Sequence, residues 1–173
     1  MKLITITGPS GAGKDTVARM LSEITGIPVL VSYTTRKMRD GEQNGREHWF
    51  VSPDNVPDKK DMLAYTQYGG YEYWTEIMQI GDAAIYVIDE EGLRDLHDRF
   101  PHIPIVAIGV FATRAIRRLH GVSEERMDRD RKRTAFPLEY FDYRIHNNGS
   151  LKRLRSKVEF VAGMIMKPTD NTD

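Results

Sequence analysis

The feature that most constrains the fold of this chain is a glycine-rich segment at residues 8–16, close to the start of the sequence. It follows a short apolar run at residues 3–7. It precedes apolar residues within positions 17–24 that have the i, i+3, i+4 and i+7 spacing of a helix face. Glycines let successive backbone N–H groups curl around a phosphate, and the N-terminus of the following helix adds a partial positive charge. A strand, a glycine-rich turn and a helix in this order therefore predict a phosphate-binding loop.

This loop matches the pattern G-x-x-x-x-G-K-[ST] from Gly8 to Lys14 and departs from it at Asp15. Lys14 would bring a mobile positive charge to the outer phosphates of a nucleotide. A metal ion would need a hydroxyl or carboxylate oxygen near the loop, which Thr16 offers first and Asp15 second. Asp15 could equally be an acidic residue that the helix dipole stabilises. The loop residues expected to contact a donor nucleotide are Gly8, Ser10, Gly11, Ala12, Gly13, Lys14, Asp15 and Thr16.

The composition is that of one ordinary globular domain, with 173 residues, 40% apolar and 29% charged. Lys plus Arg and Asp plus Glu are equal at 25 each, so no net field draws the protein to a nucleic acid or a membrane. The chain has no cysteine, which excludes disulfides and thiolate metal sites. The first apolar run is too short for a signal peptide, and no stretch of about 18 apolar residues occurs. We expect a cytoplasmic protein that is a monomer or a homodimer.

Strand-like and helix-like patterns alternate along most of the chain. This alternation predicts an α/β fold with a parallel sheet covered on both faces, and the phosphate-binding loop would lie at the carboxyl edge of the strands. Asp89 closes an apolar strand at that edge, where a ligand or metal role is favoured over that of a plain surface acid. The expected strands are residues 2–7, 29–31, 83–88, 103–110 and 143–145, and the expected helices are residues 14–25, 93–100, 115–119, 123–137 and 151–167.

Residues 32–74 depart from this alternation, because polar, aromatic and turn residues dominate and periodicity is weak. Arg36 and Arg39 lie here, in the loop after the second expected strand, and could grip one phosphate bidentately. The plainer alternative is a solvated charged loop, but a place beside the phosphate-binding loop favours the binding role. Aromatic residues at positions 65–74 could stack a base, although a small antiparallel hairpin is the preferred interpretation.

The segment at residues 32–45 resembles the acceptor-binding signature of guanylate kinases, Ser-x-x-Thr-Arg-x-x-Arg-x-Gly-Glu-x-x-Gly, and residues 50–52 continue it with Phe-Val-Ser. Residues 147–151 also resemble a stretch that lies near the donor adenine in that family. With the loop at residues 8–14, the similarity covers most of the chain. The resemblance implies a three-layer P-loop kinase fold and an enzyme that uses ATP and Mg²⁺ to phosphorylate a nucleoside monophosphate.

The resemblance also implies roles for individual residues. Arg36 and Arg39 would hold the acceptor phosphate together with Tyr73. His48 stands where the family has a phosphate-binding tyrosine and could donate a hydrogen bond there. Asn147 would frame the base of the donor nucleotide.

The positions that read guanine depart from the family pattern. Ala64 replaces the glutamate that accepts hydrogen bonds from guanine, and Val87 replaces the first acid of an Asp-x-Asp pair, of which Asp89 remains. Ser32 and Thr75 are left as possible base contacts. Leaving the donors of guanine unpaired in a closed site would cost about 1–3 kcal/mol each, so we expect the acceptor base to be other than ordinary guanine.

An arginine-rich segment at about residues 117–133 resembles the family's lid, whose arginines stabilise charge on the transferring phosphoryl group. The arginines expected to act are Arg118 with Arg129 or Arg131. The alternative is a solvated basic face that pairs with the acidic residues Glu124, Glu125, Asp128 and Asp130. The expected organisation is one domain with a core at residues 1–31 and 82–173, an acceptor-binding insertion at about 32–81 and this lid.

Three other functions are weaker or stay open. Ribose 1,5-bisphosphate phosphokinases resemble this chain in Gly-Lys-Asp-Ser/Thr and in Asn-Asn-x-Gly-Ser-Leu, and such an acceptor would explain the missing base reader. A non-catalytic guanylate-kinase-like binding module is disfavoured, because those modules have lost the loop lysine that this chain keeps as Lys14. Binding of nucleic acid through the basic lid is disfavoured by the zero net charge.

Overall fold

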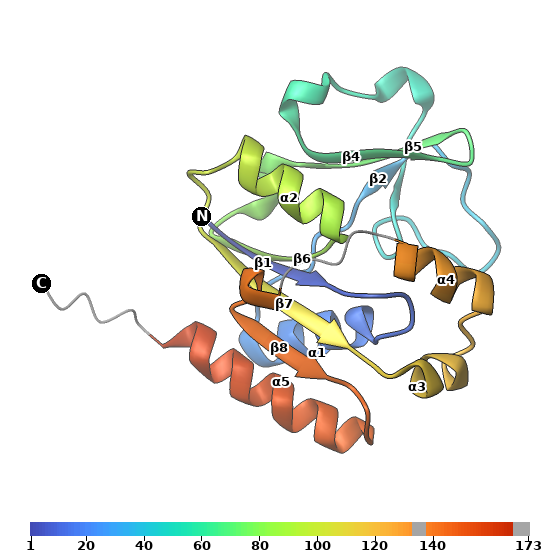
Figure 1. Cartoon of the computed structure of the whole chain (residues 1–173). Coiled ribbons are helices and arrows are strands. Elements are labelled where there is room, and N and C mark those ends of the chain that lie inside the picture. The colour runs from blue at the N-terminus through green and yellow to red at the C-terminus, as the bar shows by residue number, and fades with distance from the viewer. Residues whose placement is uncertain (133–137, 168–173) are drawn as a thin grey trace, which may run out of the picture.

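A parallel sheet with strand order β6-β1-β7-β8 forms the centre of the molecule (Figure 1). The computed structural model describes residues 1–132 and 138–167, apart from the side chains of Tyr68, Arg129, Lys132 and Leu138. The predicted α/β fold with a parallel sheet is confirmed. The strands of this sheet are β1 Lys2–Thr7, β6 Ala83–Val87, β7 Ile105–Phe111 and β8 Tyr143–His146.

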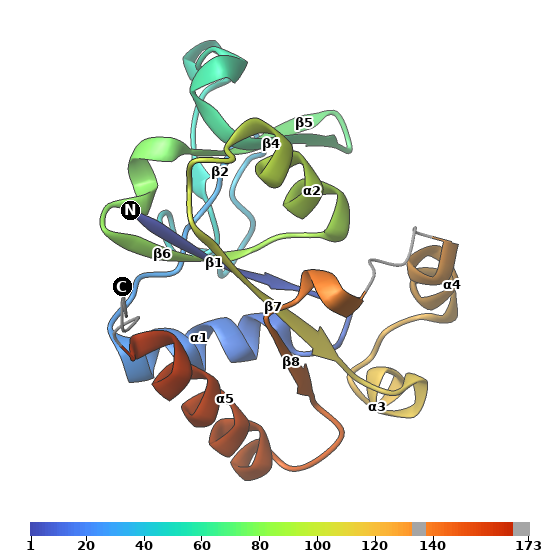
Figure 2. The same cartoon turned by 60° about the vertical axis from the view of Figure 1, so that its left-hand side comes forward.

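Helices cover both faces of this sheet (Figure 2). Successive side chains of β1 point to opposite faces, so Leu3 and Ile4 enter different core clusters. The cluster around Ile4 packs against α1 (Lys14–Thr25) and α5 (Leu151–Met166), and the cluster around Leu3 packs against α2 (Glu90–Arg99). The apolar spacing predicted for α1, α2 and α5 matches the faces that they bury, apart from Leu151, which is exposed. The helix predicted at residues 115–119 buries none of its residues, and Leu119 is 81% exposed.

The strand expected at residues 29–31 is wrong in extent, because the structure has a single bridge there, between Val29 and Ile85. The Ile85 N–H donates to the Pro28 carbonyl at 2.8 Å, and the Leu30 N–H donates to the Ile85 carbonyl at 2.8 Å. Pro28 has no N–H to extend the ladder, and the chain then turns away into the insertion. This segment still runs beside β6, so the insertion begins at the edge of the central sheet.

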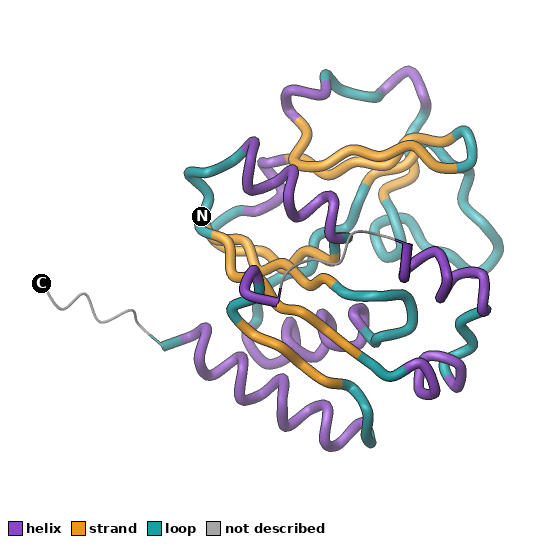
Figure 3. The backbone as a smooth tube through the Cα atoms, viewed as in Figure 1, coloured by secondary structure: helices purple, strands orange, loops and turns teal. Residues whose placement is uncertain are grey.

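The insertion forms a second, smaller sheet with strand order β3-β2-β5-β4 (Figure 3). Its hairpin turns at Gly69 and Gly70, whose φ angles of 61° and 81° are left-handed, so the predicted antiparallel hairpin is confirmed. Three short 3₁₀ helices, Pro53–Asn55, Lys59–Asp61 and Ile77–Ile80, complete the region. The strands are β2 Tyr33–Thr34, β3 Trp49–Phe50, β4 Met62–Tyr68 and β5 Tyr71–Glu76.

A register shift in the hairpin ties the small sheet to the core. The pairing of β4 with β5 skips Leu63, with Met62 opposite Glu76 and Ala64 opposite Thr75. This bulge breaks the usual alternation, so Met62 and Leu63 are both fully buried. Leu63 enters the core cluster beneath α2, and the chain then turns Ala64 toward a cavity.

The lid begins after β7 with α3 (Arg114–Leu119), followed by α4 (Glu124–Lys132). The helix expected at residues 123–137 is confirmed as far as Lys132, and residues 133–137 lie outside the described part of the chain. A short 3₁₀ helix, Leu138–Tyr140, leads back to β8. Within the described residues, no helix has both the length and the apolar character needed to cross a bilayer.

Candidate functional site

The phosphate-binding loop connects β1 to α1 in a conformation that glycines permit. Gly11 and Gly13 have φ angles of 73° and 97°, in the left-handed region. A Cβ on Gly8 would lie 2.0 Å from the Val110 carbonyl oxygen, and a Cβ on Gly13 would lie 2.5 Å from the Asn147 side-chain nitrogen. The backbone of β7 and the Asn147 side chain therefore approach the loop too closely for other residues at these positions.

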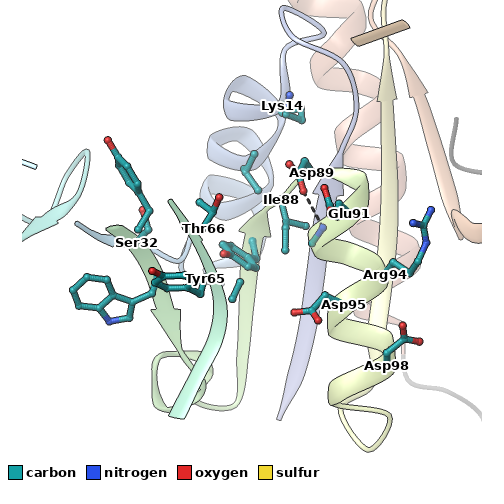
Figure 4. A pocket seen from close by; sticks show the side chains of 16 residues that line it. Lys14, Ser32, Tyr65, Thr66, Ile88, Asp89, Glu91, Arg94, Asp95 and Asp98 are labelled. Carbon is teal, nitrogen blue, oxygen red and sulfur yellow. Dashed lines mark hydrogen bonds between the residues drawn. The ribbon is translucent and has the colours of Figure 1, made fainter. Parts of the chain in front are cut away.

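Lys14 lines two cavities. Its Nζ donates to the carbonyls of Gly8 at 2.8 Å and Pro9 at 3.3 Å. It lines a larger cavity of about 810 Å³, between α2, β6 and the hairpin, and a smaller one of about 360 Å³, beside the loop and the start of α5. Figure 4 shows Lys14 at one end of the larger cavity, with Thr66 and Asp89 on opposite walls. The Lys14 ammonium therefore borders both cavities.

The smaller cavity brings together six of the residues predicted to bind the donor nucleotide. Gly8, Ser10 and Ala12 belong to the same loop but do not line it. Asn147, which is 8% exposed, also holds the loop in place, because its side-chain N–H donates to the Ala12 carbonyl at 3.0 Å. The predicted residues that line this cavity are Gly11, Gly13, Lys14, Asp15, Thr16 and Asn147.

Asp15 and Thr16 suit a magnesium ion by their chemistry. Both lie in the first turn of α1 and line the smaller cavity beside Lys14. Magnesium takes oxygen ligands and commonly relies on one or two protein groups together with phosphates. Among the described residues, no three His, Cys, Asp or Glu side chains gather into a metal site of their own. A metal at this place would therefore depend on the phosphates of a nucleotide.

Arg36 is the buried centre of the predicted acceptor-phosphate loop. Its guanidinium donates to both carboxylate oxygens of Glu42, at 3.0 and 2.8 Å, and contacts the Tyr73 hydroxyl. This pairing raises the pKa of Arg36 and lowers the pKa of Glu42 to about 2. The Arg39 N–H also donates to Glu42 at 2.7 Å, while its side chain is exposed. The two arginines therefore share one loop that Glu42 organises, and Arg39 is the more accessible of them.

Ser32 and His48 form a second polar pair in this region. Ser32 Oγ lies 2.8 Å from His48 Nδ1, and Ser32 lines the larger cavity. Burial is the main cause that lowers the pKa of His48, and the nearby positive charge of Arg36 adds to it. The imidazole is therefore kept neutral near pH 7, where it has one N–H donor and one acceptor nitrogen.

The lowered pKa of His48 predicts a pH dependence of stability. The folded protein binds a proton at this ring less readily than the unfolded chain, whose histidine pKa is about 6.5. The stabilisation is present above that pKa and is lost as the pH falls from it toward the folded pKa. We expect the Tm of the wild type to fall further between about pH 7.5 and 5.5 than that of His48→Gln. His97→Gln, on the exposed face of α2, is the control, and parallel curves for wild type and His48→Gln would contradict the prediction.

The base-contact positions are arranged differently from the expectation. Thr75 is fully buried and does not line the larger cavity; its hydroxyl donates to the Tyr86 hydroxyl at 3.1 Å. Tyr86 does line the cavity, and burial raises its pKa. Tyr86 is not among the residues that the sequence predicts for the site, and its one signal there is a phenol within the apolar run at residues 83–88. Thr75 can therefore act on a ligand through Tyr86.

Asp89 caps α2, because its carboxylate accepts from the Gly92 N–H at 2.9 Å, and it also lines the larger cavity (Figure 4). Capping explains an acid at this position without a ligand. The cavity nevertheless gives Asp89 access to one. Asp89 can therefore cap α2 and also contact a ligand in the larger cavity.

The lid arginines pair with acidic residues of the lid itself. Arg118 Nε lies 2.5 Å from Glu124, and an Arg131 nitrogen lies 3.5 Å from Asp128. Neither arginine lines the two cavities described above. The side chain of Arg129 lies outside the described part. In this conformation Arg118 and Arg131 are paired and exposed, as the alternative of a solvated face describes.

Comparison with known proteins places the chain in a family. The guanylate kinase family model matches residues 1–161. A guanylate kinase from Gloeobacter violaceus is 30% identical over 96% of this chain and 87% of its own length. One from Fusobacterium nucleatum is 33% identical over 60% of this chain and 61% of its own length. A third guanylate kinase, from Cupriavidus metallidurans, is 36% identical over 57% of this chain and 50% of its own length. A crystal structure of guanylate kinase from Anaplasma phagocytophilum shares the fold, with a TM-score of 0.71 and 20% identity over 97% of this chain and 87% of that one. The chain belongs to the guanylate kinase family and has its P-loop fold.

Proposed function

We propose that this protein transfers a phosphoryl group from ATP to a nucleoside or deoxynucleoside monophosphate, with Mg²⁺ as cofactor, and that the acceptor base is not ordinary guanine. The observation that carries the proposal is the position of Lys14 between two cavities. Phosphoryl transfer requires a donor and an acceptor phosphate to meet in line, with positive charge between them. The family relationship supports the same reaction class.

Each group of residues has a part in this reaction. The backbone at Gly11–Gly13 and Lys14 would hold the outer phosphates of the donor. Arg39, with Arg36, His48 and Tyr73, would align the acceptor phosphate. Asp15 and Thr16 would hold Mg²⁺, which would neutralise phosphate charge. The lid arginines expected to reach the transferring group, after release from Glu124 and Asp128, are Arg118 and Arg129 or Arg131.

The walls of the larger cavity support an acceptor other than guanine. Ala64 presents a methyl group where a base reader is needed, and Ser32 and Tyr86 offer neutral hydroxyls. A hydroxyl can donate or accept, so these residues can match a base that presents both carbonyl and N–H groups. Ser32, Thr75 through Tyr86, and Asp89 are the proposed base-side contacts.

The acceptor can be identified with a substrate panel. ADP release would be measured with ribo- and deoxyribonucleoside monophosphates, modified pyrimidine nucleotides and ribose 1,5-bisphosphate. We expect turnover with at least one nucleotide other than GMP and dGMP. Turnover with ribose 1,5-bisphosphate alone would favour the sugar-phosphate kinase, which the missing base reader also fits. The absence of turnover with every acceptor would favour a non-catalytic module.

Restoring a carboxylate in the hairpin should restore selectivity for guanine. The quantity to compare is the ratio of kcat/KM for GMP or dGMP to kcat/KM for the best acceptor of the wild type. We expect this ratio to be about tenfold higher in Ala64→Glu than in the wild type, because two hydrogen-bond donors of guanine gain an acceptor. Ala64→Gln is the matched control, since it adds similar volume without the charge. An unchanged ratio in Ala64→Glu, or an equal gain in Ala64→Gln, would contradict this assignment of Ala64.

We further propose that the protein works as a single kinase domain, with the core, insertion and lid boundaries given above. Its partners would be ATP and a nucleoside monophosphate, without a nucleic acid or a membrane. It would act as a monomer or a homodimer in the cytoplasm.

A further inference from the structure

The lid holds both backbone polar groups of one residue in the phosphate-binding loop. Asp130 of α4 accepts from the Ser10 N–H at 2.9 Å and from the Ser10 hydroxyl at 3.3 Å. Arg117 of α3 donates its Nε–H to the Ser10 carbonyl at 2.7 Å. A short ion pair between Arg117 and Asp130 closes the ring. We call Ser10, Arg117 and Asp130 together the Ser10 clamp.

The Ser10 clamp differs from the other ion pairs of the lid. The side chains of Arg117 and Asp130 are 11% and 7% exposed, whereas those of Arg118 and Glu124 are 57% and 50% exposed. Buried charges that bind backbone groups fix a geometry far better than exposed pairs do. The Ser10 clamp therefore holds the lid in a fixed position against the loop.

Packing continues this contact to the next residue of the loop. A Cβ on Gly11 would lie 2.3 Å from a methyl carbon of Val122, so the turn between α3 and α4 rests directly against Gly11. The ring of His120 also lies 2.8 Å from the Gly11 carbonyl, measured to Nδ1. Gly11 and His120 both line the smaller cavity. The lid thus touches Gly11, which borders the proposed donor site, as well as Ser10 beside it.

Asp130 has two opposite effects on phosphate binding by the loop. Its carboxylate aligns Ser10, but it also sets a negative charge beside a loop whose N–H groups would bind the phosphates of ATP. Two like charges at short range repel strongly where water is excluded. Arg117 contacts both Asp130 and Ser10, so it can cancel that charge without loosening the loop.

We propose that Asp130 is a positioning residue for the donor nucleotide, which acts through Ser10, and that Arg117 offsets the charge that Asp130 brings to the loop. The proposal rests on the proposed function, since it takes the loop to bind the phosphates of ATP. It predicts a specific order of affinities among variants. Loss of Arg117 alone should be worse than loss of the charges of both Arg117 and Asp130, because the single variant removes a positive charge and keeps the Asp130 carboxylate beside the phosphates.

The test measures Kd for ATP and ADP, with Mg²⁺ present, on the full chain. We expect Arg117→Met to weaken binding about 30-fold, and Arg117→Met/Asp130→Asn to recover about tenfold of that loss. Asp130→Asn alone should weaken binding about threefold. Glu125→Gln, an exposed carboxylate of α4, is the matched control for Asp130→Asn. Melting curves identify any variant that fails to fold.

A second readout does not need a nucleotide. Hydrogen exchange of the Ser10 amide in the free protein should be at least about tenfold faster in Asp130→Ala, which removes the acceptor, than in the wild type and unchanged in Glu125→Ala. A double variant that binds no more tightly than Arg117→Met, or an unchanged Ser10 amide, would overturn the positioning role. Wild-type protein that binds neither ATP nor ADP would overturn the proposed function and the positioning role together, which distinguishes the two failures.

Discussion

Replacement of Lys14 by alanine is expected to lower kcat roughly 10³-fold while the protein stays folded. The Lys14 ammonium borders both cavities, so its charge is available to the donor phosphates and to the group in transfer. Among the described residues, no other one lines both of these cavities. The hydrogen bonds lost from the Gly8 and Pro9 carbonyls would change the free energy of unfolding by only about 1 kcal/mol.

Lys157→Ala is the matched control for this variant. Lys157 also donates to a backbone carbonyl, that of His146 at 2.5 Å, but it lines neither of the two cavities that Lys14 borders. We expect its kcat to equal that of the wild type. Steady-state kinetics with the best acceptor and a thermal melt of each variant decide between the two roles. Full turnover in Lys14→Ala would refute the mechanism, and loss of folding in that variant alone would show a structural role instead.

Gly8→Ala is expected to lower the free energy of unfolding by about 3 kcal/mol. The φ angle of Gly8 is 153°, which L residues rarely adopt, and its new Cβ would lie 2.0 Å from the Val110 carbonyl oxygen. The obstacle is backbone of the neighbouring strand β7, which cannot move aside as a side chain would. Relief of the clash would require β1 and β7 to separate at the loop, so binding of ATP should weaken as well.

Gly163→Ala is the control of opposite sign. Gly163 lies inside α5 on an exposed face, and a Cβ added there would meet no neighbouring atom within 4 Å. Alanine should therefore raise the free energy of unfolding by about 0.5–1 kcal/mol through its better helix propensity. Urea unfolding of both variants tests the pair. A stable Gly8→Ala protein would show that the loop can shift away from β7.

Much of the central sheet could be predicted because its signals are local. Residues 3–7 form a short, mainly apolar run, the glycines of the loop have positive φ angles, and the helix that follows has a regular apolar face. The short ladder at residues 29–31 could not be predicted in extent, since it depends on where Pro28 meets β6. Apolar runs report burial, whereas the length of a ladder depends on partners far away in sequence.

The site was harder to predict than the fold, because its decisive contacts join distant segments. The motifs identify Lys14 and Arg36, but nothing in the sequence near Thr75 indicates that its hydroxyl bonds to Tyr86. Likewise the charge pattern presents Asp130 as one of several acids on a solvated face, although it lies against Ser10. Charge patterns along a helix describe its own neighbours and carry no information on a loop that packs against it from more than a hundred positions away.

The bulge at Leu63 has a consequence for how the molecule opens. Leu63 anchors the small sheet in the cluster beneath α2. Arg99, at the end of α2, donates to the Met62 carbonyl at 2.9 Å and fastens the same point. We therefore expect the hairpin and α2 to unfold locally as one unit, so that the stability of α2 limits the mobility of the hairpin.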